Sequence, residues 1–586
     1  MPAKCALLLL ALAVLCATAS ARTRGKLVLV ENGKSDFVIV IGAKASPSEQ
    51  HAAQELQTFL AEMSDAKLPI VSDDGPMRPH EIILGDNRHL SQSGIKVNFE
   101  KLGDEGFNLR VTDRLVAIAG GRLRGTMYGV YTLLEDYLGC RWFSSDVSRI
   151  PKLDCVALGR LNDTQVPALE YREPFYIDAF DADWAARNKM NSASARLDAP
   201  RGGKITYKGF VHTFYPLLPP DQYFAQHPEY FSLVKGKRTT DGAQLCLTNP
   251  EVVRIVTESV RRWLAESPEA NIVSVSQNDC YGWCECDNCK AIDDREGSHA
   301  GTMINFVNQI AANIEKDYPN VAIDTLAYQY TRKPPKTIRP RHNVIVRLCS
   351  IECCFSHPLA TDDYEQNVSF RDDIVGWHKL TDRLYIWDYV TSFAHYLNPF
   401  PNLEVLGPNI QFFVNNGVKG VFEEGNYGSL GGELAELRAY LMAKFLWNPD
   451  YDQEKALSEF LEGYYGQAAG PIRAYLDMLH EKVKQDHIHM HIWTGPDAKF
   501  LTTENLEHAQ WLFKSALRRA ENDQVRLRVQ VAQLPLQYVQ IMRLKPGPKR
   551  LRLLDEFMAV ARQKKITQIR EGGPIEQWEE EIRKQG

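Results

Sequence analysis

The chain has 586 residues, of which 44% are hydrophobic and 24% charged, and its formal net charge at pH 7 is −6. This length exceeds what one hydrophobic core supports, so we expect several domains. An acidic balance without a basic block excludes a protein that binds nucleic acid through its phosphates.

The first 21 residues predict a cleaved signal peptide. Lys4 supplies a positive start, residues 6–15 form an apolar run too short to cross a bilayer, and residues 19–21 give small side chains at a cleavage point. No later apolar segment approaches ~20 residues, so we expect no membrane span. The prediction is an exported protein, extracellular or, in a bacterium, periplasmic.

Residues 22–150 are expected to form a small α/β accessory domain. Its strand-like runs lie at residues 37–41, 81–84, 107–111 and 115–118. Amphipathic helices are expected at residues 50–63 and in a segment that ends near Leu138. The tract 148–167, with its scattered prolines, is expected to be a linker.

From residue 165 to 450 short β-rich runs alternate with helical patterns, which predicts a central (β/α)8 barrel of the TIM type. Asn249 is expected to cap a helix that begins at Pro250. The eight expected strands lie at residues 169–177, 210–214, 244–247, 272–276, 322–328, 344–348, 384–387 and 420–423. Residues 451–586 are almost entirely helical in pattern and predict a C-terminal helical domain.

Acidic residues follow several of these strands, where the loops of such a barrel carry the chemistry. Asp279 follows the fourth strand and Glu423 ends the eighth, so the two carboxylates are expected to meet across the barrel mouth. Glycoside hydrolysis needs such a pair, one acid to protonate the leaving oxygen and a second group opposite it. Glu424 is the reserve for Glu423, since a shift of one residue exchanges the side chain that faces the pocket. The alternative is that these acids cap helices or pair with arginines.

Substrate-binding candidates surround the same strand ends. Trp387 and Tyr389 bracket Asp388, and Tyr328 ends the fifth strand. Their rings are suited to contact a pyranose, although Trp387 is equally expected to fill the top layer of the barrel. The other candidates for polar contacts are Arg172, His212, Asn278 and Asn426.

Ten of the 12 cysteines lie beyond the signal peptide, and they allow either disulfides or a metal site. Cys284, Cys286 and Cys289 have metal-ligand spacing that suits a structural zinc, and Cys349, Cys353 and Cys354 are further ligands or disulfide partners. No HExxH signature occurs, so we expect catalysis to require no cofactor. Asn162 and Asn367 fit glycosylation acceptors in a eukaryotic host.

A series of motifs occurs in order at residues 212–214, 227–231, 236–238, 245–250, 277–279, 284–289, 327–328 and 420–447. These motifs resemble the domain of unknown function 4838, part of which forms glycoside hydrolase family 163. Residues 120–122 through 141–143 resemble the accessory domain that precedes family 67 α-glucuronidases and family 20 hexosaminidases.

The resemblance implies a retaining mechanism in which the substrate's 2-acetamido group attacks the anomeric carbon of a β-N-acetylglucosaminide. Glu423 and Asp279 are then acid/base and orienting group, in either assignment. One alternative is an exo-acting α-glucuronidase, whose substrate carboxylate needs a cation such as Arg172 or Arg347. Another is an inactive protein that only binds glycans. The expected partner is a carbohydrate or glycoprotein, and nothing in the sequence sets an oligomeric state.

Overall fold

The computed structural model describes residues 25–585. The expected signal peptide lies outside these residues. The chain forms two compact units, the first extending to Pro167 and including residues 182–189 and 196–203, and the second containing the rest. No helix among the described residues has both the length and the apolar character needed to cross a bilayer.

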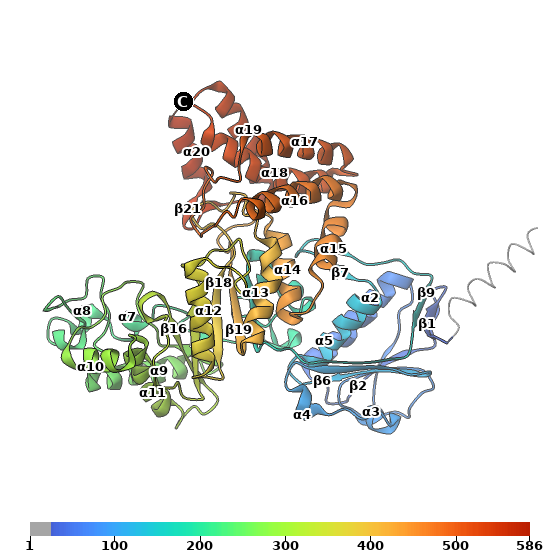
Figure 1. Ribbon diagram of the computed structural model, residues 1–586. Coiled ribbons are helices and arrows are strands. Elements are labelled where there is room, and N and C mark those ends of the chain that lie inside the picture. Colours follow the sequence, from blue (N-terminus) through green and yellow to red (C-terminus); the bar gives the residue numbers. More distant parts are fainter. Residues whose placement is uncertain (1–24, 586) are drawn as a thin grey trace, which may run out of the picture. The chain divides into compact units, whose positions relative to one another are not determined.

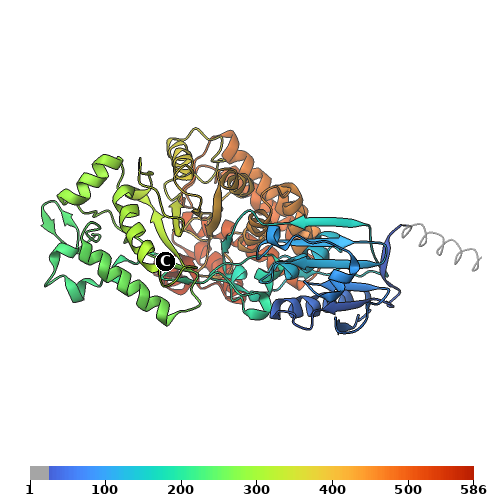
Figure 2. The same cartoon turned by 90° about the horizontal axis from the view of Figure 1, so that it is seen from below.

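The first unit is built on a six-stranded sheet, whose strands lie side by side in Figure 2 (blue to cyan). In sheet order these are β10 (Leu161–Gln165), β5 (Phe107–Val111), β6 (Leu115–Gly120), β4 (Glu81–Leu84), β2 (Val38–Ile41) and β3 (Ile70–Ser72). Helices cover both faces (Figure 1), namely α2 (Pro47–Ser64) with α5 (Gly125–Thr132), and α3 (Arg88–Ser93) with α4 (Phe99–Leu102). The small α/β fold predicted here is confirmed.

Residues 148–167 are not the expected linker. Strand β9 (Cys155–Leu158) pairs with β1 (Leu27–Glu31), and β10 forms the edge of the six-stranded sheet beside β5. The prolines that suggested a linker, Pro151 and Pro167, lie outside these strands, where a missing backbone N–H breaks no pairing.

The second unit contains a seven-stranded parallel sheet. In sheet order its strands are β11 (Tyr171–Phe175), β19 (Val418–Glu424), β18 (Leu384–Tyr389), β17 (Val344–Cys349), β16 (Ala322–Ala327), β15 (Ile272–Ser274) and β12 (Tyr207–Lys208). The sheet curls so that its two edge strands approach each other. The rings of Tyr171 on β11 and Tyr207 on β12 lie only 5.6 Å apart. Side chains that share their face therefore line a concave inner surface.

The predicted eight-stranded barrel is not confirmed. Among the described residues β11 and β12 are not paired, and residues 244–247 form no strand of the sheet. The Gln244 side chain instead binds the loop after β15, and Phe231 and Leu245 form a single bridge. Residues 210–214 also leave the extended state, since His212 has a positive φ of 53° and α7 (Phe214–Leu217) begins at once.

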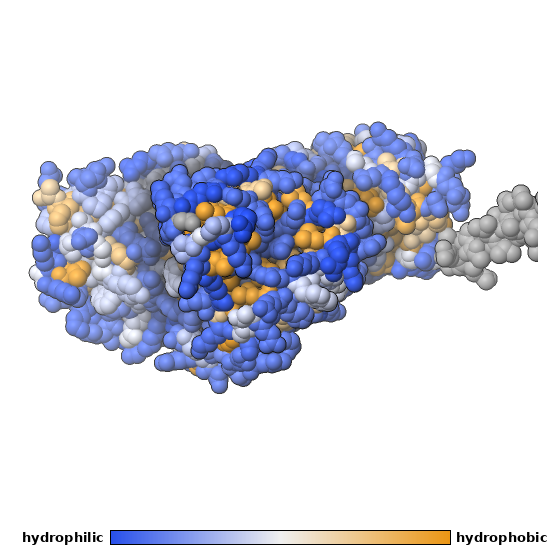
Figure 3. Space-filling view, turned by 90° about the horizontal axis from the view of Figure 1, so that it is seen from above, coloured by the Kyte–Doolittle hydropathy of each residue, from blue (hydrophilic) through white to orange (hydrophobic). Residues whose placement is uncertain are grey.

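Helices alternate with the strands and then continue to the C-terminus (Figure 1). Asn249 caps α9 (Pro250–Glu266) as predicted, its side chain accepting from Glu251 N. The helices after β15 are α10 (Asp287–Glu296), α11 (Ala300–Ile314), α12 (Glu365–His378), α13 (Leu403–Asn415), α14 (Ala435–Trp447), α15 (Gln453–Tyr465), α16 (Ala469–Gln485), α17 (Thr503–Arg519), α18 (Asp523–Arg543), α19 (Pro548–Lys564) and α20 (Ile575–Lys584). Figure 3 looks onto the C-terminal helices, whose surface is mostly hydrophilic with separate apolar patches.

Candidate active site

Alternation along β19 directs its two terminal glutamates to opposite faces of the sheet. Phe422 and Glu424 share a face, and the Phe422 ring lies 4.7 Å from that of Trp387 and 5.1 Å from that of Phe210. Those rings surround the Arg347 guanidinium, which also lies over Tyr207 on the concave surface. Glu424 therefore points into the concave side, and Glu423 points out of it.

Gly420 makes room for the aromatic layer beneath these glutamates. Tyr171 on β11 and Tyr385 on β18 stack across β19, with ring centroids 5.8 Å apart. A Cβ at Gly420 would lie 2.7 Å from the Tyr385 ring, so any side chain here would separate the two tyrosines. This layer closes the lower part of the concave side and leaves the strand ends as the accessible part.

Glu424 has the environment of a general acid. Its Oε2 accepts a hydrogen bond of 2.8 Å from Trp387 Nε1, and the side chain is buried. The pKa of Glu424 is raised to about 8, mainly by burial and to a smaller extent by the negative charge of Glu571, while the Trp387 hydrogen bond opposes the rise. The carboxyl is therefore protonated at neutral pH and has a proton to give.

Glu423 forms a buried acidic pair with Asp388 behind the sheet. Burial, and then the charge of Asp388, raise the pKa of Glu423 well above its usual range, and its Oε2 has no partner among the described residues. Asp388 accepts from the Ser350 hydroxyl, and burial raises its pKa to about 6. Asp388, a candidate for substrate binding, therefore points away from the concave side on which Trp387 and Tyr389 lie.

Tyr389 connects Glu424 with the other strand ends. Its ring stacks on Trp387 at 6.3 Å, and its hydroxyl is within electrostatic range of both Glu424 and Tyr328. The Tyr328 hydroxyl donates to Asp279 Oδ1 at 3.2 Å, and Asp279 is solvent-exposed. Asp279 and Glu424 are therefore two acids near these tyrosines, Asp279 by a hydrogen bond to Tyr328 and Glu424 by its charge acting on Tyr389.

The polar candidates differ in how many hydrogen bonds their side chains already make within the protein. His212 donates from Nδ1 to Gln277 O at 2.8 Å and lies 6.1 Å from the Tyr328 ring. Asn278 is occupied structurally, since Nδ2 donates to Ala243 O and Oδ1 accepts from Tyr215 N. Asn426 is buried, and neither of its amide atoms has a hydrogen-bond partner among the described residues.

The two arginines that were candidates for binding a substrate carboxylate contact other protein groups instead. Arg172 is fully buried on the outer face, donating to Leu169 O at 2.6 Å with its guanidinium 5.3 Å from the Trp447 ring. Arg347 lies inside the sheet and forms an ion pair of 2.9 Å with Asp324. Neither guanidinium faces the accessible strand ends.

The C-terminal region contributes residues that the sequence did not indicate. Tyr427, just after β19, donates to Glu571 Oε1 at 2.7 Å, and Glu571 is the acid whose charge reaches Glu424. Glu571 lies between β20 (Gln568–Arg570) and β21 (Gly573–Pro574), 144 residues from Tyr427. No local pattern marks such a distant residue.

The cysteine-rich loop after β15 forms a four-thiol cluster. The Sγ atoms of Cys284, Cys286 and Cys289 lie with that of Cys246 within 4.8 Å of one another, and Leu233 N donates to Cys284 Sγ. Each of the ten cysteines in residues 25–585 is free, so the expected disulfides are not shown. Four thiols at this separation fit the tetrahedral coordination of zinc.

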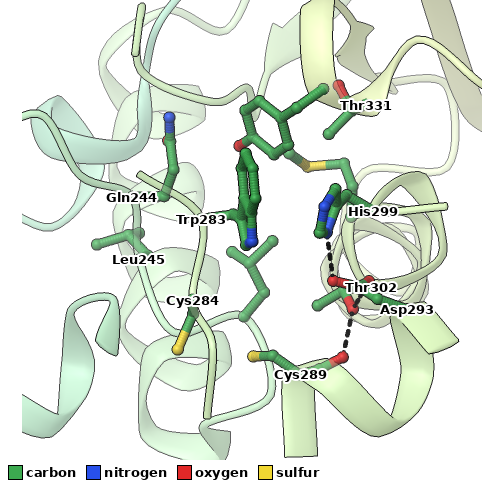
Figure 4. Close-up of a pocket in the computed structure, with 12 residues that line it drawn as sticks. Gln244, Leu245, Trp283, Cys284, Cys289, Asp293, His299, Thr302 and Thr331 are labelled. Carbon is green, nitrogen blue, oxygen red and sulfur yellow. Dashed lines mark hydrogen bonds and ion pairs between the residues drawn. The ribbon is translucent and has the colours of Figure 1, made fainter. Parts of the chain in front are cut away.

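The pocket beside this cluster is too small for a sugar. It has a volume of about 20 Å³, and Figure 4 shows the rings of Trp283 and His299 on facing sides above Cys284 and Cys289. His299 is oriented by a contact of 2.6 Å between its Nδ1 and Asp293 Oδ2. A volume of this size holds about one water molecule, whereas ligand pockets span roughly 300–1,000 Å³.

Comparison with known proteins gave two family matches. The family model described as domain of unknown function (DUF4838) matches residues 142–477, and that described as glycosyl hydrolase family 67 N-terminus matches residues 31–133. No curated protein matches the chain.

Similar solved structures include a GH115 4-O-methyl-α-glucuronidase, BtGH115A, with specificity for decorated arabinogalactans. It is 12% identical with a TM-score of 0.58, over 92% of this chain and 77% of that one. Another is the Flavobacterium johnsoniae chitobiase FjGH20, 12% identical with a TM-score of 0.39, over 92% and 94% of the two chains. The first similarity establishes a shared fold alone, and the second is too low to support an inference.

Proposed function

This chain belongs to the DUF4838 family, and from that premise we propose that it is an exported glycoside hydrolase that cleaves a β-N-acetylglucosaminide linkage in a glycan. The observation that carries the proposal is Glu424, a buried carboxyl with a pKa of about 8 at the end of a parallel strand, among aromatic side chains. The family 67 N-terminal match and the shared fold with a glucuronidase are consistent with a glycosidase.

In the proposed reaction Glu424 is the general acid/base. It gives its proton to the glycosidic oxygen as the bond to the anomeric carbon breaks, while the carbonyl oxygen of the substrate's 2-acetamido group attacks that carbon. The Glu424 carboxylate then takes a proton from the water that opens the cyclic intermediate, so the β-configuration is retained. Asp279, hydrogen-bonded to Tyr328, orients the acetamido group.

Other side chains near the strand ends supply the remaining contacts with the sugar. Trp387 and Tyr389 supply aromatic area for a sugar ring, and His212 supplies a polar group near Tyr328. The buried Asn426 supplies an amide that has no hydrogen-bond partner among the described residues. The four thiols of Cys246, Cys284, Cys286 and Cys289 hold a structural zinc that braces the loop carrying Asp279. Catalysis itself uses no cofactor in this scheme.

An exo-acting α-glucuronidase is the second candidate, favoured by the family 67 N-terminal match. The positions of two arginines weigh against this candidate, since a uronic carboxylate needs a cation that faces the sugar. Arg172 packs on Trp447 and Arg347 is paired with Asp324.

The deciding experiment compares the two neighbouring glutamates. Glycan release from a complex N-glycoprotein is followed by mass spectrometry for wild type, Glu424→Gln and Glu423→Gln. Both exchanges are nearly isosteric, and only the first removes a proton donor from the concave side. We expect Glu424→Gln to lose at least ~100-fold in rate and Glu423→Gln to stay within ~10-fold.

The other outcomes are equally informative. A larger loss in Glu423→Gln would transfer the acid role to the outward-facing residue and refute our assignment. Failure of wild type to release any glycan, with release of glucuronic acid from uronic-acid glycans, would favour the second candidate. Binding of glycans without turnover would identify a protein that only binds carbohydrate.

A further inference from the structure

A second group of metal-binding side chains lies where the loop after β17 meets the connection between α16 and α17. Cys354 is buried, and its Sγ lies 3.4 Å from His357 Nδ1 and 3.2 Å from His489 Nδ1. An oxygen of Asp362 completes the group, and the four potential ligand atoms all lie within 4.8 Å of one another. None of these residues takes part in the glycosidase site.

The donor set matches one class of ion. One thiolate, two imidazoles and one carboxylate form a tetrahedral set of the kind that zinc prefers, and alkaline-earth ions would require oxygen ligands throughout. Both imidazoles direct the same nitrogen, Nδ1, at the sulfur. The other nitrogen of His357, Nε2, is buried and has no hydrogen-bond partner among the described residues.

A buried amide holds two of the four ligands in place. Asn367 is fully buried on α12, and its Nδ2 donates to Asp362 Oδ2 at 2.7 Å and to Cys354 O at 3.1 Å. Its Oδ1 accepts from Cys354 N at 2.7 Å. Such outer contacts orient metal ligands, and they also remove Asn367 from the set of glycosylation acceptors.

His489 is held by ring stacking and by hydrogen bonds between the two segments. The His489 ring stacks on Tyr364 with centroids 4.3 Å apart. The Ser356 hydroxyl donates to Ile488 O at 2.7 Å, and Phe355 N donates to Met490 O at 2.9 Å. These two hydrogen bonds bring residues 354–357 and 488–490 together without involving the four ligand side chains.

We propose that Cys354, His357, Asp362 and His489 bind a zinc ion. All four positions come from protein side chains, so the ion leaves no open position for a substrate and acts structurally. It joins the loop after β17 to the α16–α17 connection, and binding stabilises the folded chain because the unfolded chain has no preformed site. This inference is independent of the glycosidase proposal.

The test measures zinc bound to the full-length protein. Wild type, His489→Ala and His487→Ala are stripped with chelator, incubated with excess Zn²⁺, desalted and analysed for zinc per chain. His487 is the matched control, since it is exposed, its ring lies 5.9 Å from that of His357, and it is not among the four ligands. We expect His489→Ala to lose one zinc per chain and His487→Ala to lose none, with the zinc-dependent rise in melting temperature reduced only in the former.

Asp362→Asn provides a second variant if His489→Ala fails to fold, because it keeps the size of the side chain. The expected result is again the loss of one zinc. Cobalt binding gives an independent signature, as the proposed site adds a one-thiolate spectrum to that of the four-thiol cluster. Zinc content equal to wild type in both folded ligand variants would overturn the proposal, as would a visible cobalt spectrum that neither variant changes.

Discussion

Glu424→Gln is expected to stabilise the protein while it abolishes activity, and the gain should depend on pH. The pKa of this carboxyl rises from 4.5 to about 8 on folding, mainly because burial disfavours the charged form. Between these values the folded state keeps a proton that the unfolded state has released, so the free energy of unfolding falls as pH rises. Each pH unit is worth about 1.4 kcal/mol, which gives about 3 kcal/mol at pH 7. The neutral glutamine carries no such cost.

The assay is urea denaturation of wild type and Glu424→Gln at several pH values from 4.5 to 8.5, followed by tryptophan fluorescence. The difference in unfolding free energy should be near zero at pH 4.5, grow with pH, and level off above about pH 8. Glu507→Gln, an exposed exchange on α17, should parallel wild type throughout. A difference that stays constant with pH, or is absent, would refute the inference that Glu424 is protonated in the folded protein at neutral pH.

Four further outcomes are expected. Trp387→Phe removes the N–H that stabilises the Glu424 carboxylate, a contact worth about 1.5–3 kcal/mol, so the alkaline limb of kcat/KM should move up by ~1–2 pH units. Glu571→Gln removes a charge that raises the same pKa, so that limb should move down; shifts in the same direction in both variants would contradict the assignment. Cys246→Ser should lower zinc content and melting temperature without changing kcat in the folded protein, and loss of turnover in a chelated but folded wild type would argue against a structural zinc. Asp279→Asn should lower kcat on N-acetylglucosaminides but not affect binding of glycans that lack the acetamido group, which titration calorimetry can check.

Local patterns in the sequence were sufficient for most of the secondary structure. The predictions of the Asn249 cap and of the strand that is β19 were correct, because each depends on neighbouring residues alone. Residues 244–247 have a strand-like composition but form no strand of the sheet. Their conformation is determined by the loop after β15, to which the Gln244 side chain is hydrogen-bonded. A short segment has no preference strong enough to oppose such tertiary contacts.

The candidate site was likewise determined partly by the sequence and partly by the tertiary structure. The sequence by itself placed Glu423 and Glu424 at the end of a strand and showed three thiols of the four-thiol cluster at metal-ligand spacing. Only the tertiary structure decided that Glu424 faces the concave side, since which face a side chain takes depends on how the strand is registered and the sheet curled. It also supplied Cys246 and Glu571, because packing brings together residues whose separation along the chain carries no signal.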